Sequence, residues 1–146
     1  MNTSIYFLFL LGAGVASCNA SSTTPPTSTT MLARDLNIVA PVQLHPEDTL
    51  DGLMGGALVN RQGCLRIEGA SSSFLVIWPM GFELEDGGVS IRDQRSGSSF
   101  RLGDRLMVGG GEVPAARVPH LSLSHPIPTH CRGPFWLASS VRQSAT

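Results

Sequence analysis

Three histidines recur at intervals of five residues, His120, His125 and His130, and Cys131 directly follows the last of them. Imidazole and thiolate groups are common ligands of zinc and copper, so this pattern raises the hypothesis of a metal site. The spacing opposes it, because residues five apart point to opposite sides of an extended chain and lie about 140° apart on a helix. We therefore expect the three histidines to lie on a solvated loop, with metal binding as the alternative. No cofactor is expected.

The glycine run Gly109-Gly110-Gly111-Glu112 superficially resembles a phosphate-binding loop. Such a loop needs a Lys-Ser/Thr pair or a helix N-terminus directly after it to balance the phosphate charge, and neither follows here. The run instead predicts a bulge or a tight corner, where another backbone passes close to the chain.

Carboxylates that could act as acid and base are also present. Glu83 and Glu85 would share one face of an extended chain, but no apolar surroundings that would raise a pKa are evident. The chain contains no Gly-x-Ser-x-Gly, His-Glu-x-x-His or Ser-x-x-Lys motif. We therefore do not expect an enzyme.

Both tryptophans lie in apolar clusters, Trp78-Pro79-Met80-Gly81-Phe82 and Gly133-Pro134-Phe135-Trp136. Clusters of this kind either line an apolar groove or pack in a core, and core packing is the commoner arrangement.

The elements that must position these residues are short, because Gly and Pro are spread through the chain. Strands or hairpin arms are expected at 57–59, 64–67, 74–78, 89–92, 100–102, 105–108 and 135–138. The continuous apolar run 74–78 predicts a strand that is buried on both faces. Residues 31–36 and 48–54 are expected to form short helical turns. Residues 31–146 then form a single, mainly β domain, an OB-like antiparallel barrel or a sandwich.

At the N-terminus, an apolar segment from Ile5 to Leu11 leads into Val15-Ala16-Ser17-Cys18. The segment has the length of a signal peptide and is shorter than the roughly 20 residues of a spanning helix. The tetrapeptide resembles the lipobox of bacterial lipoproteins. This resemblance implies that residues 1–17 are removed and that Cys18 carries a diacylglycerol group. The alternative is cleavage after Ala20, which releases a soluble secreted protein.

In the lipoprotein family an aspartate after the lipidated cysteine retains the protein at the inner membrane. Asn19 stands at that position and favours the outer membrane of a two-membrane cell. The following residues up to Thr30 are rich in Ser, Thr and Pro and contain no large apolar side chain, which predicts a disordered linker over 18–30. In the domain behind it, the segments 63–67, 78–82, 109–112 and 131–136 together resemble a pattern found among small uncharacterised bacterial exported proteins.

Three cysteines are an odd number for an exported protein, and lipidation of Cys18 leaves Cys64 and Cys131 as a pair. An oxidising compartment favours a disulfide between them, and two separate buried thiols are the alternative.

The formal net charge is −1, and the ten positive charges are scattered arginines. Nucleic acid is not an expected partner, because it requires a basic patch. The sequence thus predicts a lipid-anchored extracytoplasmic protein that acts as a binding or structural module. Its expected partner, besides the membrane, is an envelope protein or a small ligand.

Overall fold

Short apolar runs between glycine- and proline-rich turns form eight strands in the computed structural model, which describes residues 37–47 and 50–145. The strands are β1 (Gly52–Arg61), β2 (Cys64–Glu68), β3 (Ser73–Ile77), β4 (Phe82–Glu85), β5 (Ser90–Asp93), β6 (Ser99–Arg101), β7 (Arg105–Val113) and β8 (Phe135–Gln143). Two 3-10 helices, η1 (Asp86–Gly88) and η2 (Val118–His120), are the helical elements of these residues. Within the described part, no helix has the length and hydropathy needed to traverse a bilayer.

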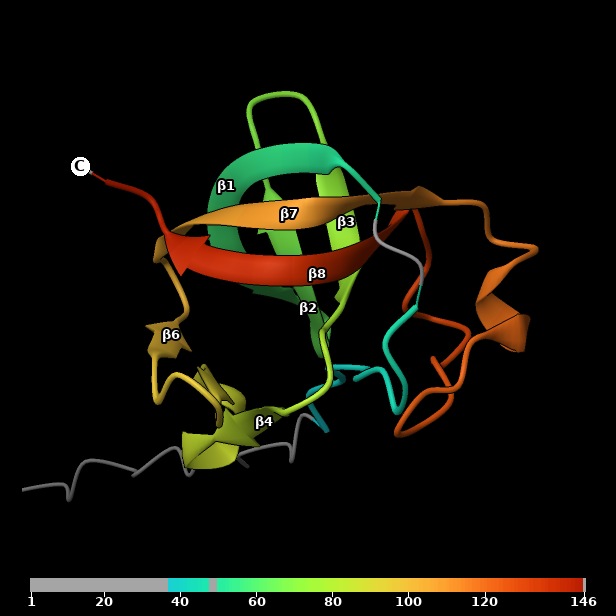
Figure 1. The fold of residues 1–146 in the computed structure, drawn as a ribbon, viewed down its shortest axis with the longest axis horizontal. Coiled ribbons are helices and arrows are strands. Elements are labelled where there is room, and N and C mark those ends of the chain that lie inside the picture. Colours follow the sequence, from blue (N-terminus) through green and yellow to red (C-terminus); the bar gives the residue numbers. More distant parts are fainter. Residues whose placement is uncertain (1–36, 48–49, 146) are drawn as a thin grey trace, which may run out of the picture. The chain divides into compact units, whose positions relative to one another are not determined.

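Five strands close into a small barrel in the order β1-β2-β3-β8-β7, so that β1 pairs with both β2 and β7 (Figure 1). All neighbours are antiparallel except β3 and β8, which run parallel with Leu75 opposite Phe135. The expected mainly β fold is confirmed, as a barrel and not as a sandwich. Counted in chain order, the five barrel strands are β1, β2, β3, β7 and β8. The first pairs with the second and the fourth, and the third runs parallel to the fifth. This is the arrangement of an OB-type barrel.

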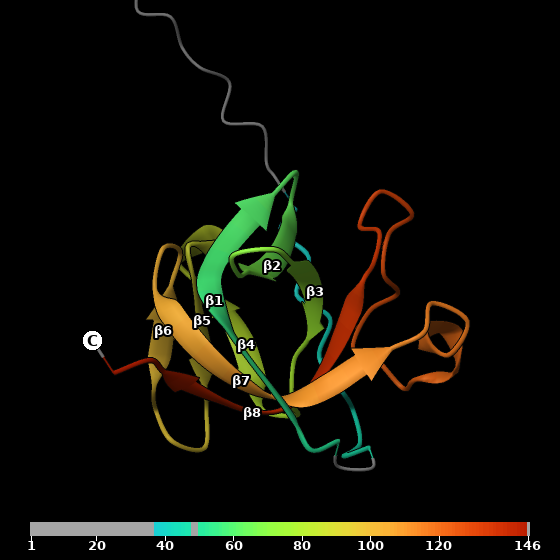
Figure 2. The ribbon, with the colours of Figure 1, turned by 90° about the horizontal axis from the view of Figure 1, so that it is seen from above.

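The strands β4, β5 and β6 form a separate three-stranded sheet, inserted in the chain between barrel strands β3 and β7. In both views the segment 38–44, which we call the strap, runs between this sheet and the long loop of residues 114–134 (Figures 1 and 2). The insertion and the loop therefore flank the strap on its two sides.

The apolar alternation of the strands produces two cores. The inner core contains Leu58, Ile67, Val76, Trp78 and Leu106 of the barrel region, and Phe82, Ile91 and Phe100 of the small sheet join it. The second core lies between β3, β8 and the 114–134 loop, and includes Leu75, Ile77, Val118 and Leu121. Strand β3 contributes alternate residues to each core. It is buried on both faces, as its continuous apolar run predicts.

The glycine run forms the predicted bulge. The register of β7 against β8 shifts between Gly109 and Gly110, and Gly110 has a φ of 141°. A Cβ atom at Gly110 would collide with the carbonyl oxygen of Leu137, so the two backbones approach more closely than any side chain permits. A tight hairpin joins the arms expected at 57–59 and 64–67, with positive φ at Gln62 and Gly63.

The helical expectation for 48–54 is wrong over its last residues, because β1 begins at Gly52. Gly52 lies opposite Gly110 and Leu53 opposite Gly109, so pairing with β7 extends the strand in place of a helical turn. The first two residues of this segment, Asp48 and Thr49, and the whole segment 31–36 lie outside the described residues.

Gln43 in the strap extends the ladder between β3 and β8 beyond their last pair, Ile77 and Leu137. Its backbone N–H donates to the carbonyl of Trp78 at 2.9 Å, and its side-chain Nε2 donates to the carbonyl of Ala138 at 2.7 Å. Gln43 as a whole is 5% exposed. Gln43 therefore joins the strap to both barrel strands.

We expect Gln43→Ala to lower the free energy of unfolding by about 1–3 kcal/mol, because the buried Ala138 carbonyl loses its donor. Urea denaturation followed by tryptophan fluorescence measures this change. The control is Gln94→Ala, since Gln94 is exposed and its hydrogen bond to Gly81 comes from the backbone N–H. Equal stabilities of the two variants would contradict the assigned role of the Gln43 side chain.

Candidate binding groove

The three histidines of the alternative metal-site hypothesis are exposed, and they do not converge on one point among the described residues. Within the described residues, the one group of three potential ligand atoms within 4.8 Å of one another belongs to Cys64, His130 and Cys131. His120 ends η2, and His125 lies in the following loop. The structure therefore does not bring the three-histidine set together.

Cys64 and Cys131 form a disulfide across 67 positions of sequence, as expected. The bond joins the start of β2 to the 114–134 loop, and both cysteines are 2% exposed. Nearby, the Arg66 guanidinium donates to the Arg132 carbonyl at 2.7 Å, and burial lowers the pKa of Arg66. Because the disulfide uses both sulfur atoms, His130 is the remaining metal ligand of that group in the oxidised protein.

The carboxylates Glu83 and Glu85 lie on β4. Glu85 accepts a hydrogen bond from Arg92 at 3.2 Å and another from Ser99 at 2.9 Å, so its charge is balanced. Glu83 is exposed and forms no ion pair with another described residue. The two carboxylates therefore differ in their surroundings and do not form an isolated pair.

Both tryptophans pack in the core, which is the commoner of the two arrangements expected for their apolar clusters. Trp78 is fully buried and stacks on Phe82 with ring centroids 5.6 Å apart. Trp136 is 8% exposed and meets Phe74 edge to face at 5.4 Å. The indole N–H groups of both tryptophans lack hydrogen-bond partners among the described residues. Neither ring lines the candidate groove, but Met80 and Phe82 of the same cluster do.

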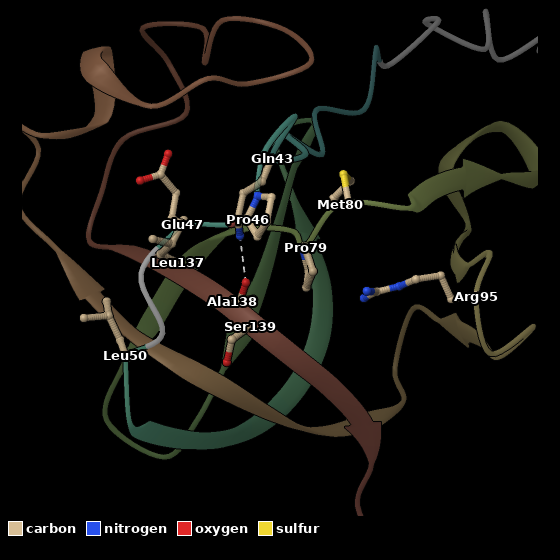
Figure 3. Close-up of a pocket in the computed structure, with 10 residues that line it drawn as sticks. All are labelled: Gln43, Pro46, Glu47, Leu50, Pro79, Met80, Arg95, Leu137, Ala138 and Ser139. Carbon is tan, nitrogen blue, oxygen red and sulfur yellow. Dashed lines mark hydrogen bonds between the residues drawn. The ribbon is translucent and has the colours of Figure 1, made fainter.

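Two depressions share Gln43 and Met80 in their linings. The smaller, about 170 Å³, is shown in Figure 3 between the Gln43 region, Pro79 and β8, with Glu47 and Arg95 among its lining residues. Both charges are partly balanced, since Glu47 lies 3.8 Å from Arg117 and Arg95 lies 3.8 Å from Asp93. Burial raises the pKa of Asp93, but hydrogen bonds from the Arg95 backbone and the Ser96 hydroxyl outweigh it and lower that pKa overall. This depression is below the usual size of a ligand site.

The larger depression, which we call the groove, has a volume of about 510 Å³, within the range of ligand sites. It is lined by Ala40, Val42, Gln43, Leu44, Met80, Gly81, Phe82, Glu83, Leu84, Ser124 and His125. Leu44 is 50% exposed and Met80 44%, which makes them two of the four large apolar residues exposed among the described residues. The groove thus gathers apolar surface that the other described residues do not cover.

One wall of the groove is the strap, which backbone hydrogen bonds fix at several points. The N–H of Leu44 donates to the Ser122 carbonyl at 2.8 Å, and the N–H of Ser124 donates to the Val42 carbonyl at 2.8 Å. The Val42 N–H donates to the Ser124 hydroxyl at 3.1 Å. With Gln43 held by β3 and β8, this wall is preformed.

The opposite wall is β4. Phe82 anchors it to the core by stacking between Trp78 and Phe100, with the second pair of centroids 6.4 Å apart. Glu83 is the one carboxylate in the lining, and the lining contains neither Arg nor Lys. The groove therefore combines apolar walls with a single carboxylate and one histidine.

Sequence reasoning identified Met80, Phe82 and Glu83 as candidates but missed the strap wall. The alternation of Val42, Gln43 and Leu44 was the available signal, and Pro41 before it is typical of a segment that pairs only at an edge. That β4 would face this segment depends on long-range packing and has no local signature.

The lipobox Val15-Ala16-Ser17-Cys18 and the linker 18–30 lie outside the described residues. Comparison of the chain with protein-family models, curated proteins and solved structures finds no match.

Proposed function

We propose that this protein is a lipid-anchored binding module of the cell envelope, which holds its partner in the groove between the strap and β4. The groove carries this proposal, because half-exposed Leu44 and Met80 flank a preformed depression of about 510 Å³. Soluble proteins rarely expose apolar side chains together in a depression except at binding sites.

The anchor is the second part of the proposal. The lipobox resemblance supports lipidation of Cys18, and a Cys64–Cys131 disulfide fits an oxidising, extracytoplasmic compartment. Two or three acyl chains make release from the membrane negligible, at about 0.8 kcal/mol for each buried methylene. The linker 18–30 then spaces the barrel from the lipid surface, with an outer-membrane location if the cell has two membranes.

Replacing the proposed lipid attachment site tests the anchor. We expect Cys18→Ser to abolish a diacylglycerol-sized mass increment on the N-terminal residue and to prevent processing before residue 18. Mass spectrometry of the full-length chain expressed in a bacterium, before and after the substitution, measures both effects. A wild-type chain that begins at Ser21 would show secretion without a lipid and would contradict this part of the proposal.

Replacing an apolar wall residue tests the groove. On residues 19–146, exported behind a cleavable signal peptide so that no lipid is attached, we expect Met80→Ser to weaken Nile red binding about fivefold. The reason is that the substitution removes apolar contact area from the groove wall. Fluorescence titration measures the affinity.

The matched control for the groove is Leu53→Ser. Leu53 is 58% exposed, on β1, and is not among the groove residues. This substitution should leave Nile red binding unchanged. An equal loss in both variants, or no loss in Met80→Ser, would show that the groove is not the apolar binding site.

A further inference from the structure

Strand β4 is an edge strand, because the order of the small sheet is β4-β5-β6 and β4 pairs only with β5 in it. An edge strand directs alternate backbone N–H and C=O groups away from its sheet. The hydrogen bonds of the neighbouring strand β5 show which residues of β4 direct their backbone groups outward.

Hydrogen bonds at both ends of β5 show which of its residues bond toward β6 and which toward β4. The Asp93 N–H donates to the Ser98 carbonyl at 2.9 Å, and the Val89 carbonyl accepts from the Leu102 N–H at 3.0 Å, so the odd-numbered residues bond toward β6. The Gln94 N–H donates to the Gly81 carbonyl at 2.9 Å, so the even-numbered residues bond toward β4.

The register of β4 and β5 pairs Glu83 with Arg92 and Glu85 with Ser90. Glu83 and Glu85 therefore direct their backbone groups toward β5, while Phe82 and Leu84 direct theirs outward. The Phe82 N–H is occupied by the Pro79 carbonyl at 3.3 Å. Among the described residues, the N–H and C=O of Leu84 and the C=O of Phe82 thus form an open hydrogen-bonding edge.

The residues that carry this edge also line the groove, since Phe82, Glu83 and Leu84 are all groove residues. An extended peptide pairing with Leu84 would lie in the groove beside the half-exposed Leu44 and Met80. Strand addition uses these two features together, since backbone hydrogen bonds provide affinity and side-chain pockets provide specificity.

The charge of the groove indicates the side chains of such a peptide. Glu83 has no ion-pair partner among the described residues, in contrast to Glu85, which pairs with Arg92. A basic side chain would complement Glu83. The anionic headgroup of a lipid would find no arginine or lysine in the lining, and His125 is the one group there that can become cationic.

We propose that the groove binds an extended segment of a partner protein as an additional strand on β4, with apolar side chains between Leu44 and Met80 and an Arg or Lys beside Glu83. This inference rests on the proposed groove function and names the class of its partner.

Fluorescein-labelled hexapeptides on residues 19–146 test the inference by fluorescence anisotropy. Three probes are compared. The arginine peptide alternates valine with arginine, and the glutamate peptide alternates valine with glutamate. The methylated peptide is the arginine peptide with alternate backbone nitrogens methylated. We expect the arginine peptide to bind, the glutamate peptide to bind about tenfold more weakly because Glu83 repels it, and the methylated peptide not to bind. Equal binding of the first two peptides, or retained binding of the methylated one, would overturn the inference.

The substitution Glu83→Gln should reduce the preference for the arginine peptide to about threefold or less, while leaving the strand edge in place. Glu112→Gln is the control, because Glu112 is exposed on β7 and is not a groove residue. An unchanged preference in Glu83→Gln would overturn the role of Glu83.

If Nile red binding depends on Met80 but no peptide binds, the groove function stands and the peptide inference fails. If Nile red binding does not depend on Met80, the groove function itself fails.

Discussion

Replacing Gly110 by alanine is expected to lower the free energy of unfolding by about 3–5 kcal/mol, which is a large part of the total stability of a small domain. Two costs combine at this position. The φ of 141° is unfavourable for any residue with a side chain, and the added Cβ would collide with the Leu137 carbonyl and lie 3.0 Å from the Ala138 Cα. Urea denaturation of residues 19–146, followed by tryptophan fluorescence, measures the change.

The matched control separates these two costs. Gly103 also has a positive φ, 96°, but a Cβ there would meet nothing within 4 Å. Gly103→Ala should therefore cost only the backbone strain, about 1–2 kcal/mol. If Gly110→Ala is no less stable than Gly103→Ala, the close approach of β7 and β8 at the bulge is not a requirement of the barrel.

The bulge also shows what the sequence can predict. The absence of Lys-Ser/Thr after Gly109-Gly110-Gly111 was enough to favour a backbone approach over a phosphate site, and β7 and β8 make that approach. The burial of β3 on both faces was predictable for a similar reason, because a continuous apolar run has only one stable environment. Both features are local consequences of residue type.

Features that depend on distant segments were not predictable from local patterns. The strap is held by hydrogen bonds to Trp78, Ala138 and Ser122, none of which is near it in the sequence. The first residues of β1 belong to a segment, 48–54, for which the sequence predicts a helical turn, yet pairing with β7 makes them a strand. The groove arises where the strap meets the inserted sheet, so neither wall alone indicates a binding site.

The groove has consequences for how the barrel could function. Edge strands are commonly protected by short length and charged side chains, and β4 has four residues and two glutamates. Arg92 forms an ion pair with Glu85, whereas Glu83 forms none with another described residue, so of this pair Glu83 is the carboxylate that a peptide in the groove would meet. The same residue that discourages indiscriminate strand pairing would therefore select a basic partner, which makes Glu83 the most informative position for binding experiments.

Loss of the Cys64–Cys131 disulfide is expected to lower the free energy of unfolding by about 4 kcal/mol, because the bond closes a loop across 67 positions and restricts the unfolded chain. Residues 19–146 contain no other cysteine, so a thiol reductant acts on this bond alone. We expect dithiothreitol to shift the urea midpoint of the wild-type chain to that of the Cys64→Ala/Cys131→Ala variant, and to leave the variant unchanged. A wild-type midpoint that does not respond to complete reduction, verified by thiol counting, would show that hydrogen bonds such as Arg66 to Arg132, and not the disulfide, hold the 114–134 loop against β2.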